Sequence, residues 1–464
     1  MTLMTAQNKK NYLAPKSFTI LLVVLLIFPA LHSALAVNTG YISDEKPAAK
    51  TAKEAESHFE GSISKKEEKQ PLFPTFKKKM DSLSPFWRDT SLFLNFRTYY
   101  FYRDKDGASN NEAWALGGSI NYESGWWRDR LQIGLVGYTS QKLYGPDSRD
   151  GTLLLRTGQQ EFSVLGQAYL ALRIIDNLNL RLYRQAFDKV PYVNKQDSRM
   201  VPNTFEAYSL IGLGLKNTDF IVSHVTKMKT RNSSSFEYIS EVAGYKGTEK
   251  GLTMGGARYK FSKGNDIGAI SQYAWDLWNT VYAETNTTWE PTAETDIRIS
   301  LQYTDQRSVG DEMDGDFETY VFGGQVGASY QGAILTLAFS STDNDSKIRN
   351  PFGGYPGYLS LMVKDFYRAD EDAWLIGFSY DFSSLGLDGL SSFFNYANGD
   401  TPDSGAAASP DQEEFDITMD YRFKKDFLKG LWLRLRYAYV DQDGPDGIDV
   451  KDFRAIVNYE LSIL

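Results

Sequence analysis

The side chains best suited to chemistry in this sequence are arginines in segments of alternating polarity. Arg434 and Arg436 stand in LWLRLRYAYV, and Arg97 and Arg103 stand in LFLNFRTYYFYRD. In an extended chain, residues two positions apart project from one face, roughly 7 Å from each other. A guanidinium stays charged and can grip a carboxylate through two parallel hydrogen bonds. Arg434 and Arg436 are therefore candidates to hold a carboxylate and pass it on. The alternative is that they form salt bridges with the many Asp and Glu residues.

Other reactive groups are scarce. The 464 residues include no cysteine and only three histidines, His32, His58 and His224. Without thiols there is no disulfide, thiolate nucleophile, Cys-ligated zinc, iron–sulfur cluster or covalent haem. Three scattered histidines do not make a metal site, so we expect neither a metal nor another cofactor.

The arginines belong to segments in which apolar and polar residues alternate, which is the pattern of β-strands with one apolar face. The alternation begins near Ser91 and continues to the C-terminus. It is clear at 131–135, 178–182, 297–302, 415–423 and 431–437. The 379 residues from 86 to 464 have room for about 18 strands, at ~21 residues for each strand and its connection.

Two architectures use such strands: a soluble sandwich with its apolar face inward, and a membrane barrel with its apolar face outward. The segment 162–174 exceeds an ordinary strand and matches the roughly 9–11 residues of a tilted membrane strand. Short turns such as 176–177 alternate with longer polar loops, for example 104–111, 305–316 and 398–414. Arginine is costly in a sandwich core but not beside a water-filled lumen. The sequence therefore predicts an all-β fold, a transmembrane antiparallel β-barrel of about 18 strands.

The first residues have the features of a secretory signal peptide. Basic residues precede an apolar run at 18–31, and Ala34-Leu35-Ala36 supplies a small-x-small cleavage site. The alternative, a single membrane anchor, is disfavoured because Pro29 interrupts the run. Cleavage after Ala36 would change the formal net charge from -9 to -12, since it removes three lysines and no acid. An acidic exported chain lacks the basic surface that nucleic-acid binding needs.

We therefore expect three regions: a signal peptide at 1–36, a charged low-complexity leader at 37–85 and an outer-membrane β-barrel at 86–464. The leader is rich in Lys, Glu, Ala and Ser and cannot bury a core. It is either a disordered or partly helical segment ahead of the first strand, or a periplasmic spacer that touches the cell wall or a partner.

Five stretches, taken in order, are similar to hallmarks of one protein family. They are FRTYYFYRD at 96–104, SRMVPNTFEAYSL at 198–210, NPFGGYPGYLS at 350–360 with DFYRADEDAW at 365–374, DFSSLGLDGLSSFFNYANGD at 381–400, and LKGLWLRLRYAYV at 428–440. In these the chain resembles the OprD-type outer-membrane porins of Gram-negative bacteria. The resemblance implies an 18-stranded channel for small hydrophilic solutes such as amino acids, small carboxylates or peptides. The implied partners are outer-membrane lipid and the solutes, with a homotrimer as one possible assembly.

In this family a ladder of arginines guides carboxylates along one wall of the lumen. The resemblance assigns Arg97, Arg103, Arg434 and Arg436 to this ladder. The first and last strands of a closed barrel are neighbours, so all four would share one wall. Asn395 and Asn398 stand where the family has arginines, which makes part of the ladder neutral and leaves the preference for anions or cations open.

The family also narrows its lumen with a loop that folds inward, here the segment 184–205. Its candidate residues are Arg184, Asp188, Lys189, Tyr192, Lys195, Asp197 and Arg199. Opposite charges on facing walls would create a transverse field that orients a zwitterion. The alternative is an ordinary external loop held by surface ion pairs.

Two other functions would use the same barrel: a scaffold or sleeve for a partner protein, and an outer-membrane hydrolase. A hydrolase needs a histidine beside a serine or aspartate. His224 is the one histidine that lies in a predicted strand, and a lone strand histidine is more often structural than catalytic. We therefore expect a channel and not an enzyme.

Overall fold

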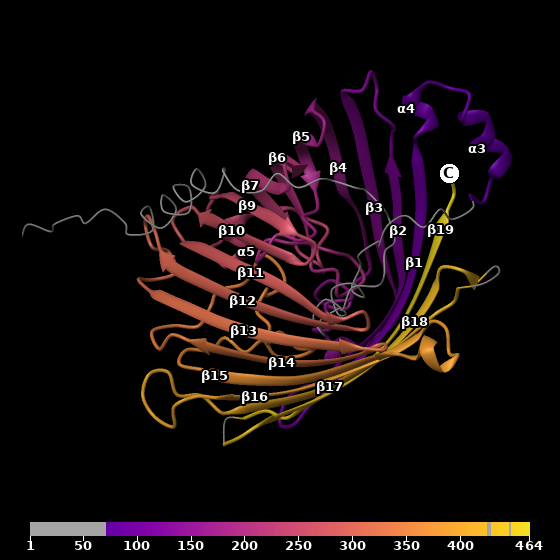
Figure 1. Cartoon of the computed structure of the whole chain (residues 1–464). Coiled ribbons are helices and arrows are strands. Elements are labelled where there is room, and N and C mark those ends of the chain that lie inside the picture. Colours follow the sequence, from indigo (N-terminus) through magenta and orange to yellow (C-terminus); the bar gives the residue numbers. More distant parts are fainter. Residues whose placement is uncertain (1–70, 425–427, 445–446) are drawn as a thin grey trace, which may run out of the picture. The chain divides into compact units, whose positions relative to one another are not determined.

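The computed structural model describes residues 71–424, 428–444 and 447–464. The predicted signal peptide and the leader up to residue 70 lie outside these residues. Most of the described chain is one antiparallel sheet that closes on itself, because β1 (Ser91–Lys105) pairs with both β2 (Asn111–Glu123) and β19 (Val450–Ser462) (Figure 1). Eighteen strands follow one another around the ring, and β8 (Glu237–Tyr238) is a two-residue addition to β7 in a loop. The predicted barrel is therefore confirmed.

The remaining elements are listed here with their bounds. The strands are β3 (Leu131–Tyr144), β4 (Phe162–Ile175), β5 (Leu178–Gln185), β6 (Thr204–Leu215), β7 (Thr218–Lys229), β9 (Leu252–Ser262), β10 (Asn265–Ala274), β11 (Trp278–Thr292), β12 (Thr295–Ser308), β13 (Glu318–Tyr330), β14 (Ala333–Thr342), β15 (Asp372–Asp381), β16 (Leu390–Asp400), β17 (Gln412–Arg422) and β18 (Leu431–Gln442). The helices are α3 (Pro74–Met80), α4 (Pro85–Arg88), α5 (Ile239–Val242), η1 (Asp147–Arg149) and η2 (Phe382–Leu385). None of the helices in the described parts of the chain is long and apolar enough to cross a membrane.

The alternation of the strands places apolar side chains outside and polar ones inside. In β18, Leu435 is 51% exposed on the outer face, whereas its neighbours Arg434 and Arg436 are 2% and 3% exposed on the inner face. A soluble sandwich would have the opposite arrangement, because water would drive the leucines inward. Exposed leucines and buried arginines are the arrangement expected of a barrel with lipid outside and a polar interior.

The two ends of the barrel differ in the length of their connections. One end carries two-residue turns such as 176–177, 263–264 and 331–332. The other end carries the long connections 145–161, 186–203, 230–251 and 343–371. Three predicted loops are shorter than expected, at 106–110, 309–317 and 401–411, because the strands continue into the polar stretches. Strand rims beyond the membrane are in water, so polar residues there can remain in the sheet.

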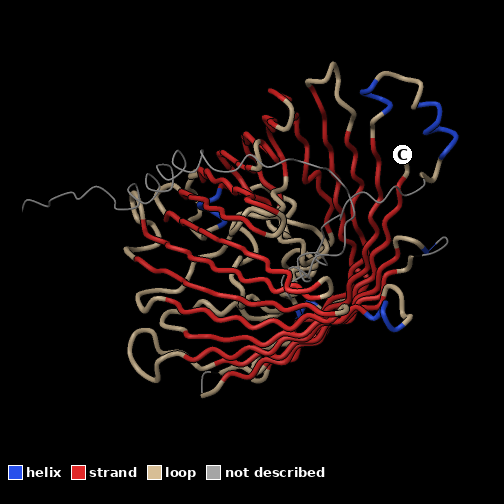
Figure 2. Tube along the Cα trace, in the orientation of Figure 1, coloured by secondary structure: helices blue, strands red, loops and turns tan. Residues whose placement is uncertain are grey.

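Two of the long loops, 186–203 and 343–371, fold inside the ring of strands, where Figure 2 shows loop segments surrounded by strands. Their apolar side chains form a core with the barrel wall. Tyr192 of the first loop and Tyr355 of the second have ring centroids 6.0 Å apart, and Phe352 stacks on Trp278 of β11 at 5.7 Å. Part of the interior is therefore filled by protein.

Candidate functional site

Four neighbouring strands, β17, β18, β19 and β1, form a wall whose inward side chains include a group of buried charged residues. The register pairs Arg434 of β18 with Asp420 of β17. The Arg434 Nε and Nη2 atoms donate to the Asp420 Oδ1 and Oδ2 atoms at 2.8 and 2.9 Å, a bidentate ion pair that is almost fully buried. Arg436 donates to the Thr418 hydroxyl at 3.0 Å. Both predicted arginines of β18 thus face inward, with partners on β17.

A second ion pair on this wall involves Arg103 of β1 and Arg454 of β19. Both donate to Asp452 of β19: Arg103 Nε at 2.7 Å to Oδ2, and Arg454 Nε at 2.7 Å to Oδ1. Asp452 is fully buried between them, whereas 23% of the Arg103 side chain is exposed. One carboxylate is therefore shared by two guanidinium groups.

A third guanidinium joins this pair around the ring of Phe101. The guanidinium carbons of Arg103, Arg199 and Arg454 lie 5.3, 5.2 and 5.0 Å from the ring centroid, within the range of cation–π contact. Arg199 donates to the carbonyls of Thr152 at 2.9 Å and Ser198 at 2.8 Å. Burial, aided by Arg454, lowers the pKa of Arg199 to about 9, which still leaves it charged at neutral pH. The contacts described around Phe101 thus bring together three cations and one carboxylate.

Arg97 has a different position from the other predicted ladder arginines. It pairs with Asp197 of the loop 186–203 at 2.8 Å and donates to Asn458 of β19 at 2.7 Å. It also donates to the carbonyl of Arg199. Arg97 therefore fastens the inner loop to the arginine wall.

The loop 186–203 reaches the opposite wall as well. The hydroxyl groups of Tyr192 and Thr304 of β12 lie 2.7 Å apart, and Gln272 of β10 donates to the Pro191 carbonyl at 2.6 Å. β12 is ten strand positions from β1 in one direction and eight in the other. A loop that contacts both strands must cross the interior of the barrel.

The other predicted residues of this loop lie away from these contacts. Asp188 and Lys189 are exposed, and Asp188 pairs with Lys195 at 2.6 Å. Arg184 is not in the loop: it belongs to β5 and pairs with Glu206 of β6 at 3.0 Å. Its neighbour Gln185 is fully buried, so Arg184 projects from the other side of the strand.

The loop 343–371 is a second inner loop that the sequence pattern did not single out as a constriction. Asn194 and Gly354 join the two loops through reciprocal hydrogen bonds of 3.2 and 2.9 Å. Farther along, the backbone N–H groups of Val363 and Lys364 donate to Glu414 of β17 at 2.8 and 2.7 Å. This loop therefore links the loop 186–203 to the charged wall.

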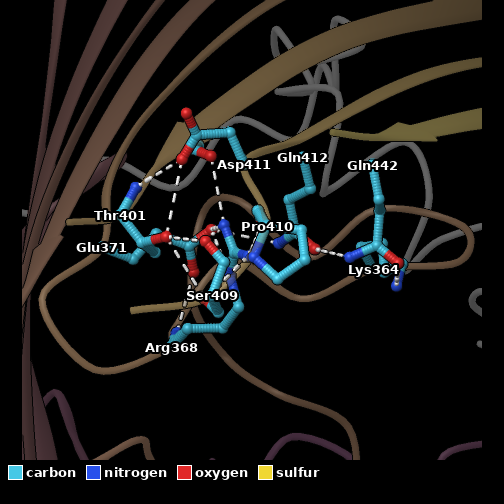
Figure 3. A network of polar contacts seen from close by, with 10 residues as sticks. Lys364, Arg368, Glu371, Thr401, Ser409, Pro410, Asp411, Gln412 and Gln442 are labelled. Atoms are coloured by element: carbon cyan, nitrogen blue, oxygen red, sulfur yellow. Dashed lines mark hydrogen bonds and ion pairs between the residues drawn. The ribbon is translucent and has the colours of Figure 1, made fainter. Parts of the chain in front are cut away.

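A polar network fixes the end of that second loop, as Figure 3 shows. Arg368 pairs with Glu371 at 2.7 Å and donates to the carbonyl of Pro410, in the neighbouring loop 401–411. Gln412 of β17 donates to Glu371 at 3.0 Å, and Lys364 donates to Gln442 of β18 at 2.9 Å. Burial raises the pKa of Glu371, while the ion pair with Arg368 acts in the opposite direction.

The two asparagines expected on the ladder lie on opposite faces of β16. Asn395 is buried inside the barrel and donates to Asp416 at 3.2 Å. Asn398 is three residues away, on the outer face, where its amide lies 3.5 Å from Glu413. Only Asn395 occupies a position at which an arginine would face the interior.

The sequence interpretation missed three of the charged groups: Asp420, Asp452 and Arg454. The alternation in VKDFR, which places Asp452 and Arg454 on one face, was the available signal. The pairing of β18 with β19 places Arg454 opposite Arg436, and this pairing assigns Asp452 and Arg454 to the charged wall.

An apolar exterior, an interior wall of charged side chains and loops that narrow a closed barrel are the properties of an outer-membrane porin. Comparison with known proteins leads to the same class, since residues 84–463 match the family model described as outer membrane porin, OprD family. This match spans most of the chain, and the protein belongs to the OprD family.

Individual relatives agree with this assignment. The chain is similar to Porin D of Pseudomonas aeruginosa, with 24% identity over 82% of this chain and 92% of the relative. The crystal structure of P. aeruginosa OccK9 (OpdG) superimposes with a TM-score of 0.75 at 25% identity, covering 82% of this chain and all of the other. The structure of P. aeruginosa OpdK with vanillate gives a TM-score of 0.71 at 21% identity, covering 81% and 99%.

The protein is therefore an outer-membrane porin and not an enzyme. His224, the histidine considered for a hydrolase, lies on β7 with its Nδ1 atom 3.0 Å from the Thr253 hydroxyl. Its neighbours in the strand, Ser223 and Val225, are buried while His224 itself is exposed, so it projects outward.

Proposed function

We propose that this porin passes small hydrophilic solutes that carry a carboxylate, such as amino acids, small organic acids or peptides. The predicted ladder and constriction residues are part of this proposal, as is export directed by a signal peptide at 1–36. The single observation that carries it is the group of cations around Phe101, where Arg103, Arg199 and Arg454 are accompanied by Asp452.

The local balance of charge supports a carboxylate as the ligand. The Nε and Nη2 atoms of Arg434 already donate to both oxygens of Asp420, so they are not available to a solute. Arg103 shares its carboxylate with Arg454 and keeps part of its side chain exposed. The Nε and Nη2 atoms of Arg103 both contact one oxygen of Asp452, Oδ2, at 2.7 Å. A solute carboxylate can form charge-assisted hydrogen bonds with the part of the Arg103 guanidinium that stays exposed.

Two further points favour this function. The OpdK structure, which has the same fold, contains vanillate, an aromatic carboxylate. A sleeve for a partner protein would need an unobstructed lumen, whereas two loops cross this one.

The test is conductance of the purified protein in planar bilayers. We expect discrete current steps that small carboxylates partly block. Loss of one charge-assisted contact costs about 1.5–3 kcal/mol, so Arg103→Gln should weaken the block by about tenfold or more. Arg258→Gln is the matched control, because it removes one arginine that pairs with Glu284 on a different wall.

Two results would contradict the proposal. Folded protein that gives no steps would exclude a diffusion channel. Equal loss of block in both variants would show that the position of Arg103 carries no special role.

A further inference from the structure

The segment 71–90, here called the strap, crosses the short-turn end of β1 and its neighbours. Figure 1 shows its two helices, α3 and α4, beyond the end of β1 and near the C-terminus. The Leu72 N–H donates to the carbonyl of Ser462, the last residue of β19, at 2.9 Å. At the other end, the N–H of Gly125 in the β2–β3 connection donates to the Phe86 carbonyl at 2.9 Å. The strap is thus fixed to the barrel on both sides.

This attachment leaves most of the apolar side chains of the strap exposed. Five of them are between 50% and 55% exposed: Leu72, Phe73, Phe76, Leu83 and Trp87. Single exposed apolar residues are ordinary, but a cluster on a positioned segment marks an interaction surface. Met80 is the one apolar residue of α3 that is buried.

The strap is also basic. Residues 71–90 contain three lysines and one arginine against two aspartates. Arg88 pairs with Asp89 at 2.8 Å, and Lys77 donates to the Arg88 carbonyl at 2.6 Å. Lys78 and Lys79 are exposed next to Phe76. The surface therefore combines apolar rings with a local excess of positive charge.

The strap lies at the short-turn end of the barrel, which is the periplasmic end in outer-membrane barrels. Trp127, in the β2–β3 connection to which the strap is bonded, is 50% exposed with the Arg128 guanidinium 4.9 Å from its ring. Aromatic and basic residues concentrate where acyl chains meet headgroups. The strap lies at the same end of the barrel, beside an interface that is already present.

We propose that the strap is an interfacial anchor that binds anionic phospholipid in the periplasmic leaflet of the outer membrane. Its exposed apolar side chains enter the acyl boundary, and Lys78 and Lys79 contact lipid phosphates. This inference depends on the position and charge of the strap and is independent of the solute.

The absence of cysteine allows a direct test, because a single introduced thiol can be labelled in the mature porin. Thr75→Cys, carrying a polarity-sensitive fluorophore, is reconstituted in phosphatidylcholine vesicles with or without phosphatidylglycerol. We expect phosphatidylglycerol to shift the emission to the blue and to increase quenching by doxyl-labelled lipid. Heat-modifiable migration on gels confirms that each variant is folded.

Two paired substitutions separate lipid recognition from general charge effects. Lys78→Gln with Lys79→Gln should reduce the ratio of membrane-bound to unbound strap by about fivefold per lysine. Lys216→Gln with Lys263→Gln makes the same charge change at exposed residues of other periplasmic turns and should have no effect.

Three outcomes would overturn the proposal. The first is a label that stays in water in both kinds of vesicle. The second is an equal response of the two double variants. The third is shielding of the label by soluble cell-wall fragments but not by lipid, which would identify a different partner.

Discussion

Arg434, Arg103 and Arg454 are each paired with a carboxylate of the barrel wall, and this pairing determines how much positive charge the wall presents. Arg434 and Asp420 satisfy each other through two short hydrogen bonds, so their fields largely cancel at a distance. Asp452 divides its charge between Arg103 and Arg454. Arg103 and Arg454 therefore leave a net positive charge around Asp452, whereas the charges of Arg434 and Asp420 balance.

Neutralising Asp452 should increase the anion preference of the channel. Asp452→Asn keeps the size of the side chain and removes the carboxylate that Arg103 and Arg454 share. We expect a shift of the reversal potential towards anions and stronger block by carboxylates, measured in asymmetric salt across a planar bilayer. Asp266→Asn, which leaves Arg258 with Glu284, is the control. Unchanged selectivity in Asp452→Asn would contradict this account.

Removing the two arginines of β18 should have the opposite effect. Arg434→Ala with Arg436→Ala leaves Asp420 without its bidentate partner, so the anion preference should decrease and carboxylate block should weaken. Arg434→Gln with Asp420→Asn removes a cation and an anion together and should leave selectivity close to that of the natural protein. A loss of selectivity in the neutral pair variant would indicate a structural effect and not a charge effect.

At the scale of elements, the strands could be predicted and the inner loops only in part. A period of two is a local signal, so the sequence predicts β18 and the inward direction of Arg434 and Arg436 correctly. The path of a loop depends on contacts between residues far apart, such as Asn194 and Gly354. No local sequence pattern predicts that the segment 343–371 folds into the barrel. The sequence pattern also predicts Arg184 in the loop and not in β5, since strand ends are poorly marked in polar sequence.

The inner loop 343–371 should become looser in acid. Burial raises the pKa of Glu371. Its ion pair with Arg368 is complete above that pKa and is lost as the pH falls through it. Because the pKa is raised, the loss begins at a higher pH than for an ordinary carboxyl group. We expect open-channel current noise to increase on acidification. Glu371→Gln should show this noise at neutral pH and little further change. Noise that depends on pH equally in both proteins would assign the effect to another group.

At the scale of the whole molecule, the barrel reverses the usual distribution of residues: leucines face outward and ion pairs face inward. This arrangement requires lipid around the outer face, because water would otherwise contact a continuous apolar surface. The outward residues of β14 illustrate the point, with Leu335, Leu337 and Phe339 between 46% and 52% exposed. Amino-acid composition alone does not distinguish a membrane barrel from a soluble sandwich. The length of the strands and the arginines on their polar faces do distinguish the two.

A charge placed on this outer face should cost more at the centre of the membrane than near its edge. Leu337→Arg lies at the middle of β14 and should lower the free energy of unfolding in lipid vesicles by about 2–4 kcal/mol. Ser341→Arg lies on the same face near the external end of the strand and should cost about 0–1 kcal/mol. Reversible urea unfolding in vesicles, followed by tryptophan fluorescence, measures both. Equal costs at the two positions would mean that β14 does not cross the membrane at the depth that its place in the barrel predicts.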